Sequence, residues 1–490
     1  MTTIIKNGFV YDGSGRPPFK GDILIRGERI IHFGNNINRR ANKTIDATGA
    51  IVTPGFIDIN NASDHYLDIF AKPHQENFLK QGITTLIGGN CGASLAPLLK
   101  GSLNPLRKWG ELPKINIGWH SIKEFLNMIK KRGIGVNFGT LVGHSTIRRA
   151  LVNDEIRDLT EGEFSALKKI VAQALQDGAF GLSAGLEDVH SKHIHFHEIL
   201  ELAKIVNASK KIYAIHLRNP KEKIEISIQE TIKVAQQTGV NLQISHFLPL
   251  KKFKESYLKA EEAIKKEIAE THIHFDCYPF ESSVIPIYKL LPDWAQAEDL
   301  EQMLAHVNAP HLKNELFAHF KNFIAKDLLI GYISPFLKFL KNKSLKEFAK
   351  NSDLKTEEAL LKLMKISRLR ATILYKNVDK QSLEKFLLSP ISIIASGHIG
   401  FSEEHQTFLE FLRWFKDKTD LPLEKAIAKI TSLPAQKYRI IKRGLIKENY
   451  YADILILRDL QPTEIMLNGQ LVLADKKLQN VLAGHTLCAT

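Results

Sequence analysis

The sequence predicts an α/β fold: a (β/α)8 TIM-like barrel with an inserted helical subdomain, and a small β-sandwich domain built from both chain ends. Two observations support this prediction. The middle of the chain alternates apolar, β-branched runs with segments of helical periodicity, whereas both ends carry short apolar runs separated by glycine turns. Repeated strand–helix units of this length imply a parallel sheet, and eight of them close into a barrel.

The β-sandwich is expected from residues 1–54 and 436–490. Near the N-terminal end, Gly21–Ile25 has the apolar, β-branched composition of a strand and leads into a glycine turn. Ala452–Leu457 repeats this pattern near the other end. Two such segments at opposite ends of a chain can pair, which leaves everything between them inserted as one unit.

The barrel is expected from residues 55–435. Helical periodicity is clear in Phe164–Gln176 and Ile224–Gln237, between apolar runs. The stretch of about 284–385 is too long and too helical for a single crossover, so we expect an inserted helical subdomain there. The predicted barrel strands include Ile51–Asp58, Ile83–Ile87, Val136–His144, Lys211–His216, Val240–His246, His272–Tyr278 and Ile391–Ser396.

Composition excludes several classes of protein. The chain has 490 residues, of which 44% are hydrophobic and 24% charged, and this is typical of a globular protein rather than a disordered or membrane protein. The net charge is +14, but the lysines are spread along the chain, so we interpret them as solvated helix faces and predict no nucleic-acid partner; polyanion binding is the minority alternative. Three cysteines, no signal-peptide pattern and no apolar run near the ~18 residues that span a bilayer predict a cytoplasmic protein without a membrane partner.

Candidate metal ligands follow several predicted strands. Cys91 stands between glycines after one strand, and His144, His216 and His246 each end another. Because barrel strands end at one rim, Cys91, His216 and His246 can together hold Zn²⁺ and leave a fourth position for water. Such a site lowers the pKa of water to about 7 and polarises a carbonyl. The alternatives are a small buried cysteine and hydrogen-bonded histidines without a ligand role.

Distinctive phrases run along nearly the whole chain: NGFVYDGSG, IDATGAIVTPGFID, QGITTLIGGNCGASLAP, LVGHSTIRRA, DGAFGLSAGL, IHLRN, QISHF, DCYPFESS, TSLPAQKY and RGLIKENYYADILIL. Together they resemble the N-acyl-D-amino-acid deacylase (D-aminoacylase) branch of the amidohydrolase superfamily. The resemblance implies the sandwich-plus-barrel fold and hydrolysis of the amide C–N bond of a small N-acylated D-amino acid. In that branch a cysteine replaces the bridging carboxylated lysine used elsewhere in the superfamily, and the resemblance implies that Cys91, His216 and His246 correspond to the ligands of the tightly held zinc.

The chain departs from the family pattern at catalytic positions. The family carries His-x-His after the first strand, where this chain has Asn60-Asn61-Ala62, so a second metal position is not expected. The family ends its last strand with Ser-Asp-Gly, whose aspartate activates the water; here the residues are Ser396, Gly397 and His398. A positioned acid or base typically contributes about 10²–10⁴-fold to the rate. His398 is the candidate substitute base, and a loop histidine without a role is its alternative.

Groups that recognise a substrate carboxylate are also replaced. The family's basic residue after the sixth strand is Leu248 here, and its tyrosine after the Gly-Leu pair is Asp188. Ser283 and Arg218 are the remaining candidates for substrate binding. We predict a hydrolase with one Zn²⁺ ion on the Cys/His/His set and no assigned oligomeric state. Two alternatives stay open: a catalytically impaired family member that acts as a binding protein, and a metal-free scaffold in which Cys91 is a plain thiol.

Overall fold

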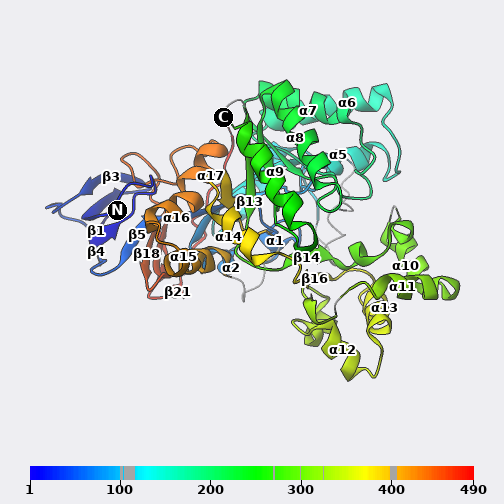
Figure 1. The fold of residues 1–490 in the computed structure, drawn as a ribbon. Coiled ribbons are helices and arrows are strands. Elements are labelled where there is room, and N and C mark those ends of the chain that lie inside the picture. The colour runs from blue at the N-terminus through cyan, green and yellow to red at the C-terminus, as the bar shows by residue number, and fades with distance from the viewer. Residues whose placement is uncertain are drawn as a thin grey trace.

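The structure, a computed structural model, describes residues 1–99, 103, 116–268, 271–297, 299–323, 325–397 and 406–489. Figure 1 shows a β-sheet region that contains the N-terminus, a central strand-and-helix region, and a mainly helical region on the opposite side. None of the described helices is long and apolar enough to cross a membrane.

The central region is built on parallel strands. In the described part of the chain, two parallel sheets follow the order β6-β7-β8 and β9-β10-β11-β12-β13-β17. Only Leu141 separates β8 from β9, and a parallel bridge between Asn61 and Gly397 joins the ends that follow β6 and β17. The α/β class is therefore confirmed. The strands are β6 (Phe56–Asp58), β7 (Ile83–Gly88), β8 (Asn137–Thr140), β9 (Val142–Gly143), β10 (Gly181–Gly185), β11 (Ile212–His216), β12 (Asn241–Ile244), β13 (His272–Cys277) and β17 (Ser392–Ile394).

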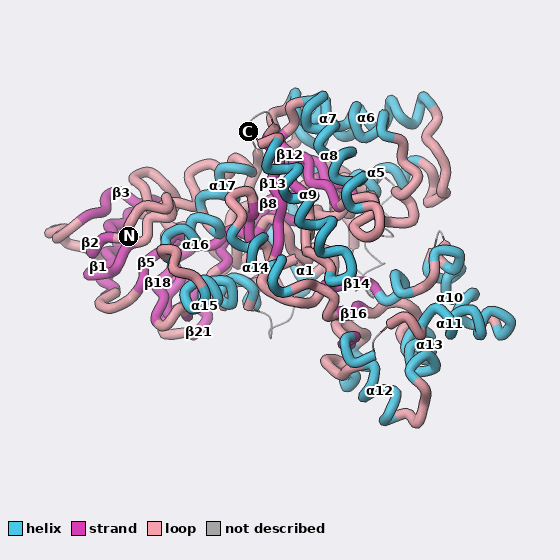
Figure 2. The backbone as a smooth tube through the Cα atoms, viewed as in Figure 1, coloured by secondary structure: helices cyan, strands magenta, loops and turns pink. Residues whose placement is uncertain are grey.

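Helices surround these strands, as Figure 2 shows by colour. Their starts follow from local sequence: Ser121 and Glu124 form a capping box on α4, and Thr160 and Glu163 form one on α6. Helix α8 ends at Gly239, in the left-handed conformation that glycine adopts without strain. The helices of this region are α1 (Asp68–Ala71), α2 (Glu76–Leu79), α4 (Ile122–Arg132), α5 (His144–Leu151), α6 (Glu161–Gln176), α7 (Phe196–Ala208), α8 (Ile224–Thr238), α9 (Lys254–Lys266), α14 (Lys380–Leu388), α15 (Thr407–Lys418), α16 (Leu423–Ile430) and α17 (Ser432–Lys437).

Strands from both ends of the chain join one nine-stranded sheet among the described residues. The link is the antiparallel pair of β5 and β18, in which Thr53 lies opposite Leu455. The predicted strand Ile51–Asp58 divides at Gly55, where a Cβ atom would lie 2.1 Å from Thr84 Oγ1. Strand β5 joins the nine-stranded end sheet, and β6 pairs with β7 in the central region. The strands are β1 (Thr2–Val10), β2 (Phe19–Arg26), β3 (Arg29–Gly34), β4 (Lys43–Asp46), β5 (Ile51–Pro54), β18 (Ile454–Arg458), β19 (Gln461–Leu467), β20 (Gln470–Ala474) and β21 (Lys477–Leu478).

The segment between β13 and α14 has a hydrophobic core of its own, with Leu316, Phe348 and Leu360 among its members. It is mainly helical but also contains a three-stranded antiparallel sheet. Helix α14 packs in the core of the central region, where Phe386 stacks on Phe247 with ring centroids 5.1 Å apart. The bounds of an inserted subdomain stay a prediction. Its elements are β14 (Ser283–Pro286), α10 (Leu300–Asn308), α11 (Lys313–Phe320), β15 (Leu328–Ile330), α12 (Leu345–Asn351), α13 (Thr356–Ile366) and β16 (Thr372–Tyr375).

Candidate metal centre

Cys91 is held in a tight loop directly after β7. A Cβ atom at Gly89 would lie 2.2 Å from the Leu141 carbonyl oxygen, and one at Gly92 would lie 2.7 Å from the Gly185 nitrogen. Both glycines have positive φ, of 75° and 76°, a conformation that favours glycine. The Gly89 N–H donates to a buried carboxylate oxygen of Asp64 at 2.5 Å. The glycines around the cysteine are therefore required by the backbone path that presents it.

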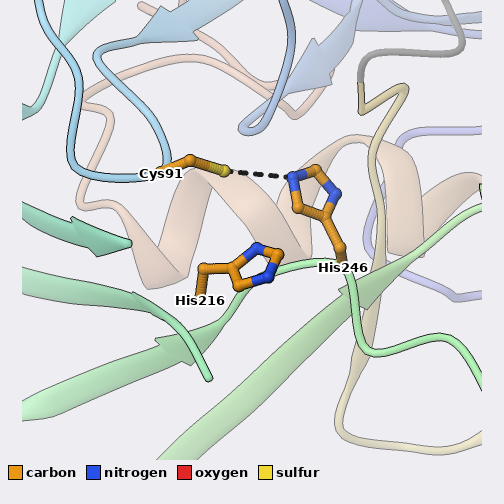
Figure 3. Close-up of side chains that lie close together, drawn as sticks. All are labelled: Cys91, His216 and His246. Atoms are coloured by element: carbon orange, nitrogen blue, oxygen red, sulfur yellow. Dashed lines mark hydrogen bonds between the residues drawn. The ribbon is translucent and has the colours of Figure 1, made fainter. Parts of the chain in front are cut away.

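The structure brings the three predicted ligands together. Cys91 Sγ lies 3.2 Å from His246 Nε2, and potential ligand atoms of Cys91, His216 and His246 all lie within 4.8 Å of one another. Figure 3 shows the side chains converging from the ends of three different strands, with one ring nitrogen of His216 facing the other two residues. A thiolate with two imidazoles is a donor set that suits zinc, so the residues present fit the ion that the sequence predicts.

A carboxylate lies near each of the two histidines. His216 Nε2 lies 3.2 Å from Glu187 Oε2, which leaves Nδ1 as the nitrogen available to a metal. His246 directs Nε2 at Cys91, while its backbone N–H donates to Asp276 Oδ1 at 3.0 Å and its Nδ1 lies 3.9 Å from that oxygen. Burial, with His216 and His65 nearby, lowers the pKa of His246 to about 3. His246 is therefore neutral, which is the form that binds metals.

Glu187 and Lys289 form an ion pair beside the centre that the sequence reasoning missed. Lys289 Nζ lies 2.6 Å from Glu187 Oε2 and 3.3 Å from Asp188 Oδ1. Burial by itself raises the pKa of Glu187, but Lys289 and His216 hold that pKa well below its usual range. The same carboxylates raise the pKa of Lys289 despite its burial. The signal available in the sequence was the pair of acidic residues just after β10, Glu187 and Asp188. Nothing in the sequence indicated that Lys289 would contact them.

Asn60 and Ala62 occupy the positions of the family's His-x-His. Asn60 Nδ2 donates to both oxygens of Asp276, at 3.2 and 3.1 Å, and lies 3.4 Å from His246 Nε2. Among the described residues, none donates a hydrogen bond to the buried Asn60 Oδ1. Ala62 packs with Tyr66 and with Tyr332 of the inserted segment. An amide side chain and a methyl group thus occupy the two positions at which the family pattern has imidazole ligands for a second metal. The absence of a second metal site stays a prediction.

Gly397 stands where the family has its catalytic aspartate. Its φ is 56°, and a Cβ atom there would lie 2.9 Å from Tyr278 Cε1 and 3.4 Å from His246 Cε1. The preceding Ser396 donates its N–H and its hydroxyl to Asp58, and burial raises the pKa of Asp58 to about 7. The end of the last strand is therefore closely packed. His398, the candidate substitute base, lies outside the described residues.

The two residues predicted to bind substrate, Arg218 and Ser283, form hydrogen bonds to other residues of the chain. The Arg218 guanidinium forms two hydrogen bonds to Glu230, at 3.1 and 2.9 Å, and a third to the Lys192 carbonyl at 2.7 Å. The Ser283 hydroxyl donates to Asn377 Oδ1 at 2.9 Å. Neither is brought into the Cys/His/His group, and their roles in substrate binding stay predictions.

His144, the fourth strand-end candidate, lies in a separate buried cluster. Its Nε2 lies 2.8 Å from Glu198 Oε1, which Arg148 Nε also contacts at 3.2 Å. His144 is fully buried and Arg148 is 2% exposed. This ion-paired cluster at the start of α5 is structural rather than part of the metal centre.

The chain is similar over most of its length to an N-acyl-D-aspartate deacylase and to D-aminoacylases. No family model matches the chain. The N-acyl-D-aspartate deacylase of Alcaligenes xylosoxydans xylosoxydans is 27% identical over 462 residues, which cover 92% of this chain and 85% of that protein. A D-aminoacylase of the same organism is 25% identical over 466 residues, covering 92% of this chain and 87% of that protein. A crystal structure of a D-aminoacylase superposes with a TM-score of 0.82 at 25% identity, over 99% of each chain. The chain is similar along nearly its whole length to this D-aminoacylase branch of the amidohydrolases.

A second D-aminoacylase structure, with a TM-score of 0.83 at 25% identity over 99% of each chain, is described as having a binuclear metal centre with one-metal activation and second-metal attenuation. By the resemblance that the sequence shows, the positions at which this chain departs from the deacylase pattern are Asn60, Ala62 and Gly397. Asn60 Nδ2 lies 3.4 Å from His246 Nε2, and a Cβ atom at Gly397 would lie 3.4 Å from His246 Cε1.

Proposed function

We propose that this amidohydrolase relative hydrolyses an amide C–N bond of a small molecule, with one zinc ion held by Cys91, His216 and His246. The supporting observation is the convergence of three ligand atoms to within 4.8 Å at strand ends, in the fold of the D-aminoacylases. We place this centre at the rim of a closed (β/α)8 barrel whose helical insertion follows β13. A zinc ion bound by such a set acts as a Lewis acid that polarises a carbonyl and lowers the pKa of water at its open position.

The chain's own residues prepare the centre for this chemistry. Cys91 supplies a thiolate, and His246, kept neutral by burial, supplies Nε2. The Nε2–H of His216 donates to Glu187, which fixes the tautomer that leaves Nδ1 for the metal. Asp276 accepts from the His246 backbone and from Asn60, so it holds both groups in place.

In the family pattern an aspartate at the end of the last strand transfers the proton. Gly397 stands at that position here and has no side chain that could do so. His398 is the candidate to hold and transfer the proton. Its replacement by alanine lowers the rate about 10²–10⁴-fold if it is the base, and leaves the rate unchanged if it has no role.

The substrate is proposed from the relatives, whose names specify N-acyl-D-aspartate and N-acyl-D-glutamate among others. Bidentate recognition of a carboxylate requires an arginine that is not already paired. Arg218 is paired with Glu230, and Leu248 is buried. We therefore propose an N-acylated compound whose amine side is held without the family's carboxylate clamp, with N-acyl amino acids as the first compounds to test.

Elemental analysis and a substrate screen test this proposal. The purified protein is expected to contain about one equivalent of zinc per chain and to hydrolyse at least one N-acetyl, N-formyl or N-succinyl derivative of a D- or L-amino acid. A protein that binds no zinc after supplementation would overturn the proposal. Bound zinc without hydrolysis above the buffer rate would support the alternative, a binding protein that keeps the metal site.

A further inference from the structure

A lysine of the inserted segment reaches the metal centre. Lys289 lies in the single turn Ile287–Leu290 that follows β14, and its ammonium group contacts Glu187 at 2.6 Å and Asp188 at 3.3 Å. The side chains of the three residues are only 14–17% exposed. This contact joins residues 102 positions apart in the sequence.

The same carboxylate also contacts a predicted metal ligand. Glu187 Oε2 lies 2.6 Å from Lys289 Nζ and 3.2 Å from His216 Nε2. Lys289, Glu187 and His216 therefore form a continuous chain of charge-assisted hydrogen bonds. A carboxylate on the second nitrogen of a metal-ligating histidine fixes the orientation of the ring and raises its basicity as a ligand.

Glu187 needs a cation to keep this position. A buried carboxylate without a partner is strongly disfavoured, because burial removes its hydration. The other nearby cation, Lys221, lies 3.9 Å from Glu187 Oε1, and its side chain is 52% exposed, so solvent weakens its contribution. Lys289, at 2.6 Å and 14% exposed, is the dominant partner.

We propose that Glu187 and Lys289 are positioning residues of the metal centre, through which the inserted segment sets the orientation of His216 and hence the affinity for zinc. The inference rests on the proposed zinc site. In this proposal the insertion contributes to metal binding although none of its residues is a ligand. Movement of the insertion away from the barrel would withdraw Lys289 from Glu187 and lower the affinity for zinc.

Zinc affinity measured by competition with a chromophoric chelator tests this proposal. Glu187→Gln and Lys289→Met are each expected to weaken zinc binding about 10–100-fold. Lys289→Arg retains the charge and should restore most of the affinity. The matched control is Lys221→Met, which removes the same charge from a more distant and exposed site and should change the affinity by no more than about fivefold.

Cobalt substitution separates repositioning from loss of fold. In the cobalt-loaded variants the thiolate-to-cobalt charge-transfer band of Cys91 is expected to remain while the ligand-field bands shift, because only His216 is reoriented. Thermal unfolding of the metal-free proteins shows whether each variant is folded. If Lys289→Met does not fold, the zinc affinity of Glu187→Gln tests the proposal by itself.

Cys91→Ala distinguishes failure of this inference from failure of the proposed function. If Cys91→Ala binds zinc as tightly as the unmodified protein, the proposed metal site is wrong. If Cys91→Ala loses zinc while Glu187→Gln and Lys289→Met bind it with unchanged affinity, the positioning role is refuted and the metal site stands.

Discussion

Placing a side chain at residue 397 tests whether the last strand still has room for the group that its relatives carry there. Gly397 has φ of 56°, and an added Cβ atom would lie 2.9 Å from Tyr278 Cε1. A non-glycine residue in this conformation costs about 1 kcal/mol, and overpacking a dense interior costs about 1–3 kcal/mol more. Gly397→Ala should therefore lower the free energy of unfolding by about 2–4 kcal/mol, measured from the midpoint of urea denaturation.

Gly239→Ala is the matched control for this measurement. Gly239 also belongs to the barrel region and has φ of 67°, but its nearest contact for a Cβ atom is Asn207 Nδ2 at an ordinary 3.7 Å. Its substitution should show the backbone cost alone, about 1 kcal/mol. Equal shifts for the two variants would refute the crowding argument. In a double-mutant cycle, Gly397→Ala should cost less in a Tyr278→Ala background than in the unmodified protein, because the two residues are in contact.

Three further predictions follow from other parts of the structure. Cys91→Ala should lose the single zinc equivalent, whereas Cys488→Ala, at an exposed free cysteine, should keep it, by elemental analysis. Asp58 is fully buried with a pKa of about 7, so the folded state retains a proton that the unfolded chain releases above pH 4. Stability should fall between about pH 4 and pH 7, by up to about 4 kcal/mol from this group, and Asp58→Asn should remove that part of the slope in urea midpoints. Glu198→Ala leaves Arg148 buried without its carboxylate and should cost about 3–5 kcal/mol, seen as a lower unfolding temperature.

Each of these predictions has a contrary outcome. Retained zinc in Cys91→Ala, or zinc lost equally in Cys488→Ala, would contradict the assignment of the ligand. A pH dependence of stability that is the same in Asp58→Asn and the unmodified protein would show that this carboxyl titrates normally. An unfolding temperature unchanged in Glu198→Ala would show that the buried ion pairs contribute nothing to stability.

The sequence by itself determined the strand pattern and the Cys91, His216 and His246 set. Apolar runs with β-branched residues report strands directly, and parallel strands of one barrel end at a common rim, so residues far apart in sequence could be placed together. The departures at Asn60 and Gly397 came from the resemblance to the deacylases, whose motifs match the sequence around both positions.

Only the tertiary structure shows which side chains surround the candidate site residues and contact them. Arg218 was predicted to bind substrate, yet its guanidinium lies against Glu230, which is presented by the next helix. Lys289 reaches Glu187 from the inserted segment, and Tyr278 fills the space beside Gly397. Periodicity fixes which face of an element is buried, but not which side chain of a distant element meets it. These contacts depend on how the insertion and the loops pack on the barrel, so they could be found only in three dimensions.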